Sequence, residues 1–161
     1  MILDLRTGIG FDVHAFAEGR KLILGGIEIQ HDKGLAGHSD ADALLHAITD
    51  ALLGSLSLGD IGTHFPDDDP RYKNADSTVF LKKAHELIRY RGYYVNNIDV
   101  VVMLQQPKIS PYSQKMEEKI SKILDIGSDR ISIKATTTEK LGFVGREEGI
   151  SVMALATVVR K

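Results

Sequence analysis

The run Gly10-Phe11-Asp12-Val13-His14 places a carboxylate and an imidazole two residues apart. We predict an extended strand here, in which successive side chains point to opposite faces. Asp12 and His14 therefore project from the same face, roughly 7 Å apart along the backbone. One strand can thus present two metal ligands side by side.

A second run, His38-Ser39-Asp40-Ala41-Asp42-Ala43-Leu44-Leu45-His46, leads into a predicted helix. Small and apolar residues recur at helical spacing, at Ala43, Ala47, Ile48, Ala51 and Leu52. Asp42, His46 and Asp50 lie four residues apart along one edge of this helix. His46 therefore belongs to a polar row on a packed helix.

Asp12, His14 and His46 together would offer a divalent cation one oxygen and two nitrogens. A fourth tetrahedral position would stay open for water or substrate, which favours a catalytic site over a structural one. The alternative is that Asp12 ends a strand, His14 caps a turn and His46 is a hydrogen-bonded histidine at the edge of the core. The pattern alone favours neither interpretation, because Asp-x-His is common and the third ligand is distant in sequence.

Composition limits the classes of protein that this chain can represent. The 161 residues, 43% hydrophobic and 26% charged, are typical of a globular protein, and we expect residues 1–161 to form a single domain. A net charge of -2 with scattered Lys and Arg argues against nucleic acid as a partner. The absence of cysteine excludes disulfides, thiolate zinc sites and a cysteine nucleophile. The N-terminal residues lack signal-peptide features and no apolar run could span a membrane, so we expect a cytoplasmic protein without a membrane partner.

The remaining local patterns indicate an α+β fold with a single sheet backed by helices on one side. Ser39 and Asp42 have a spacing close to that of a capping box, which predicts that the first helix runs from about Asp40 to Leu53. The valine-rich stretch Ile98–Leu104 is expected to be an inner strand covered on both faces. The other predicted elements are a hairpin over 21–30 turning at Gly25-Gly26, helices from about Ser77 to Gly92 and from Ser110-Pro111 to Leu124, and strands over Ile131–Ala135 and Ile150–Val159.

Two segments have features that suit an anion. Thr136 and Glu139 have capping-box spacing and predict a short helical turn, whose free backbone N–H groups would bind phosphate. The alternative for this segment is a simple helix cap with β-prone threonines. His38-Ser39 precedes the helix of His46, so the same argument applies there. Two such helix starts beside one metal would suit a diphosphate.

The stretch from Gly59 to Asp76 has no sustained periodicity and is predicted to be a long loop. Its Asp67-Asp68-Asp69 run is either a solvated surface or a set of acceptors for sugar hydroxyls or a second hard metal. Glu139 is a better candidate for a second cation, because it lies beside the proposed phosphate-binding hydroxyls.

Five motifs, in the same order along the chain, resemble those of the 2-C-methyl-D-erythritol 2,4-cyclodiphosphate synthase family. They are Gly8-Ile9-Gly10-Phe11-Asp12-Val13-His14, Gly37-His38-Ser39-Asp40-Ala41-Asp42, Gly59-Asp60-Ile61-Gly62, Phe65-Pro66-Asp67 and the run from Lys134 to Phe143. The resemblance covers nearly the whole chain. It implies a homotrimer with its sheets around the threefold axis and active sites between neighbouring subunits. It also implies a phosphorus-oxygen lyase of the non-mevalonate isoprenoid pathway, which converts 4-diphosphocytidyl-2-C-methyl-D-erythritol 2-phosphate into the cyclic diphosphate and CMP.

The same resemblance implies roles for individual residues. It makes Asp12, His14 and His46 ligands of a Zn²⁺ ion, one per active site, and Glu139 a ligand of Mg²⁺ or Mn²⁺ between the substrate phosphates. His38 and Thr137 match positions that stabilise the transition state. The implied contacts to the small-molecule nucleotide-diphosphate substrate are Asp12, His14, His38, Ser39, Asp60, Ile61, Gly62, Phe65, Pro66, Asp67, Asp68, Asp69, Leu104, Gln105, Gln106, Pro107, Lys108, Ile109, Ser110, Thr136, Thr137, Thr138, Glu139, Phe143 and Arg146. The implied central cavity, which in the family can hold an isoprenoid diphosphate, is lined by Phe143, Arg146 and Glu148.

Two other functions fit the same residues. A zinc-dependent phosphohydrolase would use a metal-bound hydroxide to attack phosphorus, and it would release no cyclic product. A non-catalytic trimer could instead use the metal for assembly and bind an isoprenoid diphosphate in its axial cavity. Product analysis separates these hypotheses from the cyclisation.

Overall fold

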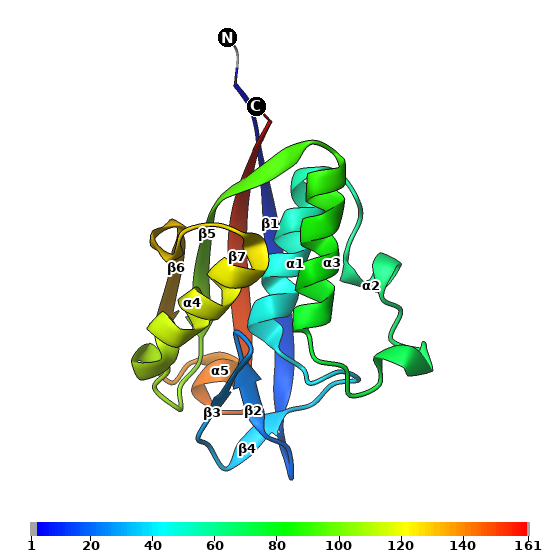
Figure 1. Cartoon of the computed structure of the whole chain (residues 1–161). Helices are drawn as coiled ribbons and strands as arrows, with labels where there is room; N and C mark the ends of the chain where they lie inside the picture. The colour runs from blue at the N-terminus through cyan, green and yellow to red at the C-terminus, as the bar shows by residue number, and fades with distance from the viewer. Residues whose placement is uncertain (1–2, 161) are drawn as a thin grey trace.

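A computed structural model describes residues 3–160 and shows a mixed five-stranded sheet with its long helices on one face (Figure 1). The strand order is β4-β1-β7-β5-β6. Neighbouring strands are antiparallel except β5 and β6, which are parallel. The strands of this sheet are β1 (Asp4–Glu18), β4 (Lys33–Leu35), β5 (Tyr93–Met103), β6 (Ile131–Thr136) and β7 (Gly149–Arg160).

The predicted α+β class and the helix-backed sheet are confirmed. The long helices are α1 (Ala43–Ser55), α3 (Thr78–Tyr90) and α4 (Ser113–Leu124), and the short ones are α2 (Ile61–His64) and α5 (Gly142–Gly145). Three 3-10 turns cover Pro70–Tyr72, Ser110–Tyr112 and Ser128–Arg130. The predicted hairpin turns at Gly25-Gly26, but β2 (Leu22–Leu24) and β3 (Ile27–Ile29) pair only with each other, so the expectation of a single sheet was wrong.

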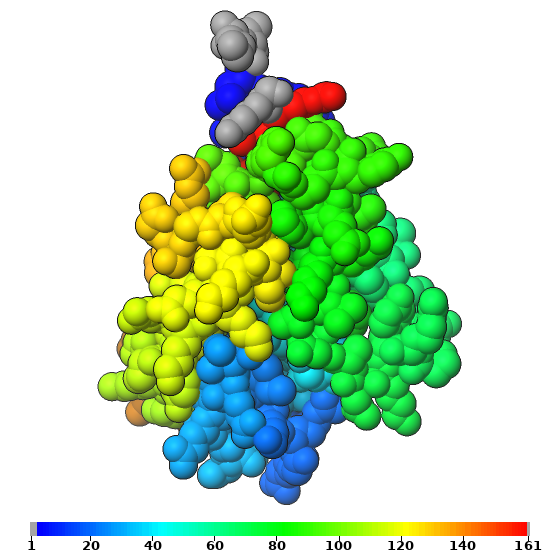
Figure 2. Space-filling model, viewed as in Figure 1, coloured from blue at the N-terminus to red at the C-terminus, as the bar shows by residue number. Residues whose placement is uncertain are grey.

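Helix α1 is the most buried helix of the fold. It packs on β1 and β7, and α3 covers its far side. In the space-filling view, α3, α4 and the β2–β3 hairpin hide most of it (Figure 2). Its buried residues include Ala43, Leu44, Leu45, Ala47, Ile48, Ala51, Leu52 and Leu53. Such a helix stays where it is because almost all of its apolar surface is removed from water.

Two glycines of β1 let α1 approach the sheet closely. A Cβ atom at Gly8 would lie 2.0 Å from the Ala51 carbonyl oxygen, and one at Gly10 would lie 1.9 Å from the Ala47 carbonyl oxygen. Because strand side chains alternate, Asp12 lies on the same face of β1 as these glycines. The close packing therefore continues along the strand directly into the proposed metal ligands.

Helix α1 begins later than the sequence pattern predicted. Its N-cap is Asp42, whose carboxylate accepts the Leu45 N–H at 3.0 Å. The hydroxyl of Ser39 instead accepts the Ala41 N–H at 3.1 Å within the preceding turn. The predicted capping box at Ser39 was therefore wrong, because Asp42, not Ser39, reaches the first free N–H groups of the helix.

The segment after β6 also differs from its prediction. Glu139 and Lys140 have φ values of 53° and 65°, so the backbone there is left-handed and cannot continue a helix. The short helix α5 begins only at Gly142, after Leu141. The expected helix start at Thr136 was therefore wrong, and so was the unbroken loop expected over 59–76, which holds α2 and a 3-10 turn.

The sheet face opposite the helices is apolar and exposed within one chain. Side chains on this face include Leu5, Ile9, Phe11, Val13, Met153 and Leu155, each at least 40% exposed. Alternate residues of β5 are likewise only partly buried. The expectation that Ile98–Leu104 is covered on both faces is thus not met by one chain alone.

None of the helices within residues 3–160 combines the length and the apolar character needed to cross a bilayer. The cytoplasmic location stays a prediction.

We expect Gly10→Ala to lower the free energy of unfolding by about 3 kcal/mol or more, because its methyl group would overlap the Ala47 carbonyl. Urea denaturation followed by circular dichroism measures this change. Gly54→Ala is the matched control, since a Cβ there meets no atom closer than 3.8 Å and lies on a helix. That control should gain about 0.5–1 kcal/mol. Equal stability of the two variants would contradict the close-packing argument.

Candidate metal centre and adjoining pocket

The structure brings Asp12, His14 and His46 together. One oxygen of Asp12, Oδ2, lies 3.0 Å from the Nδ1 atom of His14 and 3.2 Å from the Nδ1 atom of His46. One donor atom from each of the three residues lies within 4.8 Å of the other two. Strand β1 supplies two of these atoms and helix α1 the third, so the glycine-mediated contact between β1 and α1 assembles the group.

The chemistry of these donors fits a metal ion. The Nδ1 atom of His14 is buried and, despite its short distance to Asp12, has no hydrogen bond of acceptable geometry. A cation would give this lone pair a partner. One carboxylate oxygen and two imidazole nitrogens, with no thiolate, form a donor set that Zn²⁺ accepts and that leaves room for a further ligand.

The ionisation of Asp12 and that of His46 depend on one another. Burial opposes ionisation of Asp12, but its contacts with His14 and His46 outweigh this effect and lower the pKa of the carboxyl group. Burial likewise disfavours the charged form of His46, yet the neighbouring carboxylates, Asp12 foremost, raise the pKa of its imidazole. A cation in the site would take over the charge that a proton on His46 otherwise supplies.

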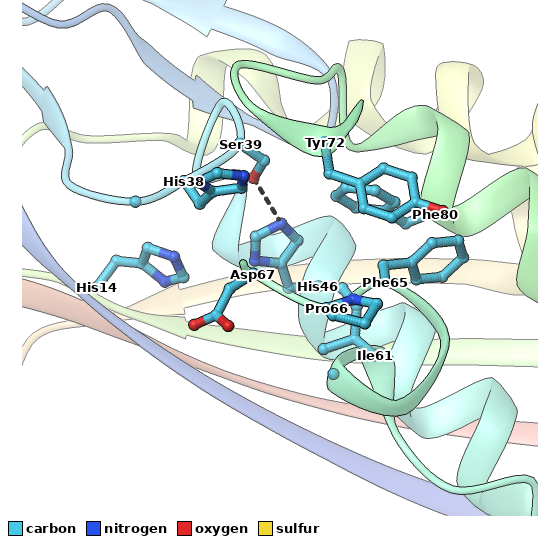
Figure 3. A pocket seen from close by; sticks show the side chains of 12 residues that line it. His14, His38, Ser39, His46, Ile61, Phe65, Pro66, Asp67, Tyr72 and Phe80 are labelled. Carbon is cyan, nitrogen blue, oxygen red and sulfur yellow. Dashed lines mark hydrogen bonds between the residues drawn. The ribbon is translucent and has the colours of Figure 1, made fainter. Parts of the chain in front are cut away.

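A pocket of about 490 Å³ opens beside the two histidines. Figure 3 shows the imidazoles on one side of it and a group of aromatic rings on the other. Its lining residues are His14, Gly37, His38, Ser39, His46, Ile61, Gly62, Phe65, Pro66, Asp67, Tyr72 and Phe80. Nine of these were named from the sequence as ligands or substrate contacts. The pocket thus combines cation-binding groups with an apolar wall.

The aromatic wall was only partly predicted. Phe65 and Phe80 have ring centroids 4.7 Å apart, and Tyr72 lies 5.6 Å from Phe80. Phe80 belongs to the apolar stripe of α3, and Tyr72 lies in a loop whose charges dominate its pattern. The sequence carried no signal that these two rings meet over the pocket.

One arginine, which the sequence pattern did not single out, holds the segment that carries His38. The guanidinium of Arg20 donates to the carbonyl oxygens of Gly37 at 3.0 Å and Ser39 at 2.6 Å. The backbone on both sides of His38 is therefore fixed by one side chain. The Nε2 atom of His38 donates to the Asp69 carbonyl at 3.2 Å, which links this segment to the acidic loop.

The carboxylates of the acidic loop have separate roles. Asp60 is the N-cap of α2 and accepts the N–H and hydroxyl of Thr63, both at 2.8 Å. Asp69 pairs with Arg71 at 2.6 Å, while Asp67 lines the pocket. Asp68, also predicted as a substrate contact, is exposed and is not among the lining residues.

The other predicted substrate segments lie elsewhere in the same chain. Leu104–Ser110 follows β5, Thr136–Glu139 follows β6, and the Leu104 N–H donates to the Thr136 carbonyl at 3.0 Å. The strand register aligns Val13 with Met103 and Thr136 in one row across β7. Three strand spacings separate β1 from β6, about 14 Å. One chain therefore presents two groups of predicted site residues at the same end of the sheet but at different strands.

The Thr136–Glu139 segment is exposed, apart from the half-buried Thr138, and its side chains hydrogen-bond to one another. The Thr137 hydroxyl lies 3.1 Å from a Glu139 carboxylate oxygen, to which it donates. Phe143 lies on α5, and Arg146 and Glu148 form an exposed ion pair of 3.0 Å just beyond it. None of these residues lines the pocket beside the histidines within this chain.

A helix-backed mixed sheet, whose first strand and first helix bring an Asp-His-His group together beside a pocket, defines an α+β protein with a candidate metal site. The chain belongs to the YgbB family, whose model matches residues 5–159. A relative from Bacillus mycoides, named 2-C-methyl-D-erythritol 2,4-cyclodiphosphate synthase, is 56% identical over 97% of this chain and 99% of its own length.

Solved structures give the same assignment. The bifunctional IspDF of Campylobacter jejuni superimposes with a TM-score of 0.96 at 46% identity, covering 99% of this chain but only 43% of that longer chain. The CDP complex of Plasmodium falciparum IspF has a TM-score of 0.86 at 36% identity, with coverage of 98% and 97%. The family predicted from the motifs is therefore confirmed.

A buried carboxylate fixes the start of the helix that carries His46. Asp42 is fully buried and accepts the N–H groups of Gly25 at 3.0 Å, Gly26 at 2.6 Å and Leu45 at 3.0 Å. It thereby ties the β2–β3 turn to α1. Burial dominates over these donors and raises the pKa of Asp42 to about 6.

This raised pKa predicts a specific pH dependence of stability. The ordinary pKa of an aspartate carboxyl group is 3.8, so ionisation of Asp42 requires more free energy in the folded chain than in the unfolded chain. The contribution of Asp42 to folding is complete below about pH 4 and is lost as the pH rises to about 6, a change of about 3 kcal/mol. Urea denaturation at a series of pH values should show this decline in the wild type and not in Asp42→Asn. Parallel pH profiles for the two proteins would contradict the assignment.

Proposed function

We propose that this chain converts 4-diphosphocytidyl-2-C-methyl-D-erythritol 2-phosphate into 2-C-methyl-D-erythritol 2,4-cyclodiphosphate and CMP. It would thus act as a phosphorus-oxygen lyase of the non-mevalonate isoprenoid pathway, with residues 1–161 as one catalytic domain. The observation that carries this proposal is the Asp12-His14-His46 group, whose two histidines line a pocket, in a chain 56% identical to a relative named for this activity.

We assign Zn²⁺ to Asp12, His14 and His46, and Mg²⁺ or Mn²⁺ to Glu139. The nitrogen-rich donor set suits zinc, and the lone carboxylate beside phosphate-binding hydroxyls suits a hard cation. When bound, these cations would withdraw negative charge from phosphate oxygens and so reduce the repulsion between two phosphate groups.

The reaction needs two anionic groups of one substrate to meet. An oxygen of the 2-phosphate forms a bond to the β-phosphorus, the bond from that phosphorus to the CMP oxygen breaks, and CMP leaves with its electron pair. No strong base is required, because the attacking phosphate is already ionised near neutral pH. The protein contributes mainly position and electrostatic stabilisation.

The chain's own residues divide this task. His38, held by Arg20 and the Asp69 carbonyl, lies in the pocket where it can stabilise the charge that develops on the phosphates. Thr137 would do the same from the Thr136–Glu139 segment. The wall of Phe65, Tyr72 and Phe80 would shield the reacting groups from water.

A second copy of the chain would complete the site. The two groups of predicted site residues lie about 14 Å apart within one chain, too far to enclose one diphosphate. The exposed apolar sheet face offers the surface on which copies could pack. We therefore propose a homotrimer with its sheets around a threefold axis, where Thr136–Glu139 of one subunit faces the histidines of the next. Phe143, Arg146 and Glu148 would line the central cavity, whose proposed ligand is an isoprenoid diphosphate.

Product analysis tests the reaction itself. Incubation of the zinc- and magnesium-loaded protein with 4-diphosphocytidyl-2-C-methyl-D-erythritol 2-phosphate should release CMP and the cyclic diphosphate in equal amounts, as followed by phosphorus NMR. His46→Ala should lose bound zinc and at least about a hundredfold in turnover together, because His46 is the residue through which α1 joins the Asp12-His14-His46 group. His85→Ala, a histidine of α3 outside the pocket, should keep both. CMP release without a cyclic product would instead indicate a phosphohydrolase.

Mixing of inactive variants tests the shared site. Glu139→Gln should keep zinc but lose its magnesium-dependent turnover. When Glu139→Gln and His46→Ala subunits are dissociated, mixed in equal amounts and reassembled, about one quarter of the interfaces in a closed ring join two intact halves. Activity should return to about that fraction of the wild-type value. No recovery in an assembly that light scattering shows to be mixed and trimeric would contradict a site shared between subunits.

A further inference from the structure

Ser77 occupies the N-cap position of α3 but does not cap the helix. Its side chain makes no hydrogen bond to the first N–H groups of α3, and it is fully buried. A serine at this position normally contributes its hydroxyl to the helix start. The hydroxyl of Ser77 instead contacts Asp40, in the turn before α1, and His46 on α1.

Asp40 and His46 are linked through Ser77. The Ser77 hydroxyl donates to Asp40 Oδ1, and the Ser77 N–H donates to Asp40 Oδ2 at 3.0 Å. The Nε2 atom of His46 lies 2.9 Å from Ser77 Oγ. The three side chains therefore form one continuous chain of hydrogen bonds that ends at a proposed metal ligand.

The direction of each hydrogen bond follows from a count of hydrogens. An ionised carboxylate can only accept, so the single hydroxyl hydrogen of Ser77 points to Asp40. Ser77 Oγ must then accept from His46, which requires the proton of the neutral imidazole to be on Nε2. The Nδ1 atom lies 3.2 Å from Asp12 Oδ2, where a proton on Nδ1 donates to the carboxylate. A metal ion in the site would replace that proton, and with Nε2 still protonated the lone pair of Nδ1 would face the ion.

We propose that Asp40 and Ser77 are positioning residues that hold His46 in the Nε2–H tautomer and direct its Nδ1 lone pair at the metal. This inference rests on the proposed metal site. The relay would also raise the basicity of His46 as a ligand, because a carboxylate acts on the ring through the serine.

Ser39 offers the competing arrangement. Its Oγ lies 3.3 Å from the same Nε2 atom, a contact drawn in Figure 3, and it already accepts the Ala41 N–H. Its hydroxyl hydrogen could therefore donate to Nε2, which would place the ring proton on Nδ1. The shorter contact to Ser77 and the bond from Ser77 to Asp40 favour the first arrangement.

Zinc affinity is the primary test, measured by competition with a chromophoric chelator. Ser77→Ala should bind zinc about 10–100-fold more weakly than the wild type. Asp40→Asn should weaken binding as well, since all three hydrogen bonds of Asp40 are accepted and an amide can accept at only one atom. The double variant should be no weaker than the worse single variant, because the two residues act in one chain.

Ser55→Ala is the matched control. Ser55 is a buried serine on α1 whose hydroxyl donates to the Leu52 carbonyl at 2.7 Å, away from the pocket. Its removal should leave zinc affinity unchanged. Unchanged affinity in Ser77→Ala, or a loss in Ser39→Ala alone, would overturn the relay.

Nitrogen-15 NMR of the zinc-loaded wild-type protein gives an independent readout that needs no variant. The His46 ring should show a protonated Nε2 and a metal-bound Nδ1, and metal bound at Nε2 would overturn the proposal. The two failures are distinguishable. A wild-type protein that binds no zinc contradicts the proposed metal site, whereas normal zinc binding with the opposite ring orientation contradicts only the relay.

Discussion

The approach of α1 to β1 is the constraint on which the rest of the structure depends. Gly8 and Gly10 leave no side chain between the strand and the carbonyls of the helix, so the two backbones come within contact. Two residues further along the same strand face, the carboxylate of Asp12 meets the imidazole of His46. A larger residue at either glycine would move the helix outward, and with it one of the three proposed ligands.

Polar groups around the start of α1 keep this arrangement in place at some cost in stability. Asp42 is buried as a carboxylate whose raised pKa records the penalty of burial, yet it joins the hairpin turn to the helix. Arg20 fixes the backbone beside His38, and Asp40 accepts a hydrogen bond from Ser77 at the N-cap of α3. Buried polar contacts of this kind favour one specific geometry at some cost in stability, as expected where a strand and a helix must bring three proposed ligands together.

Local periodicity predicted most of the strands and the long helices, and motif spacing indicated Asp12, His14 and His46 as candidate ligands. The predictions failed where tertiary contacts decide. Ser39 had the better capping pattern, but Asp42 is the cap because its carboxylate also satisfies the hairpin turn. The left-handed backbone at Glu139 and the meeting of Tyr72 with Phe80 left no trace in the pattern. Glu139 is separated from His46 because β6 and β1 are not neighbours in the sheet. The alternation of side chains along one strand predicts which face each residue occupies, but it does not predict the order of the strands.

We propose that Asp12, His14 and His46 form one metal site because β1 and α1 pack without intervening side chains. X-ray diffraction from crystals of the purified protein, collected on both sides of the zinc absorption edge, tests it most directly. We expect one anomalous peak per chain, bounded by the Asp12 carboxylate and the two imidazoles. Zinc-containing crystals with no peak at that position would contradict it.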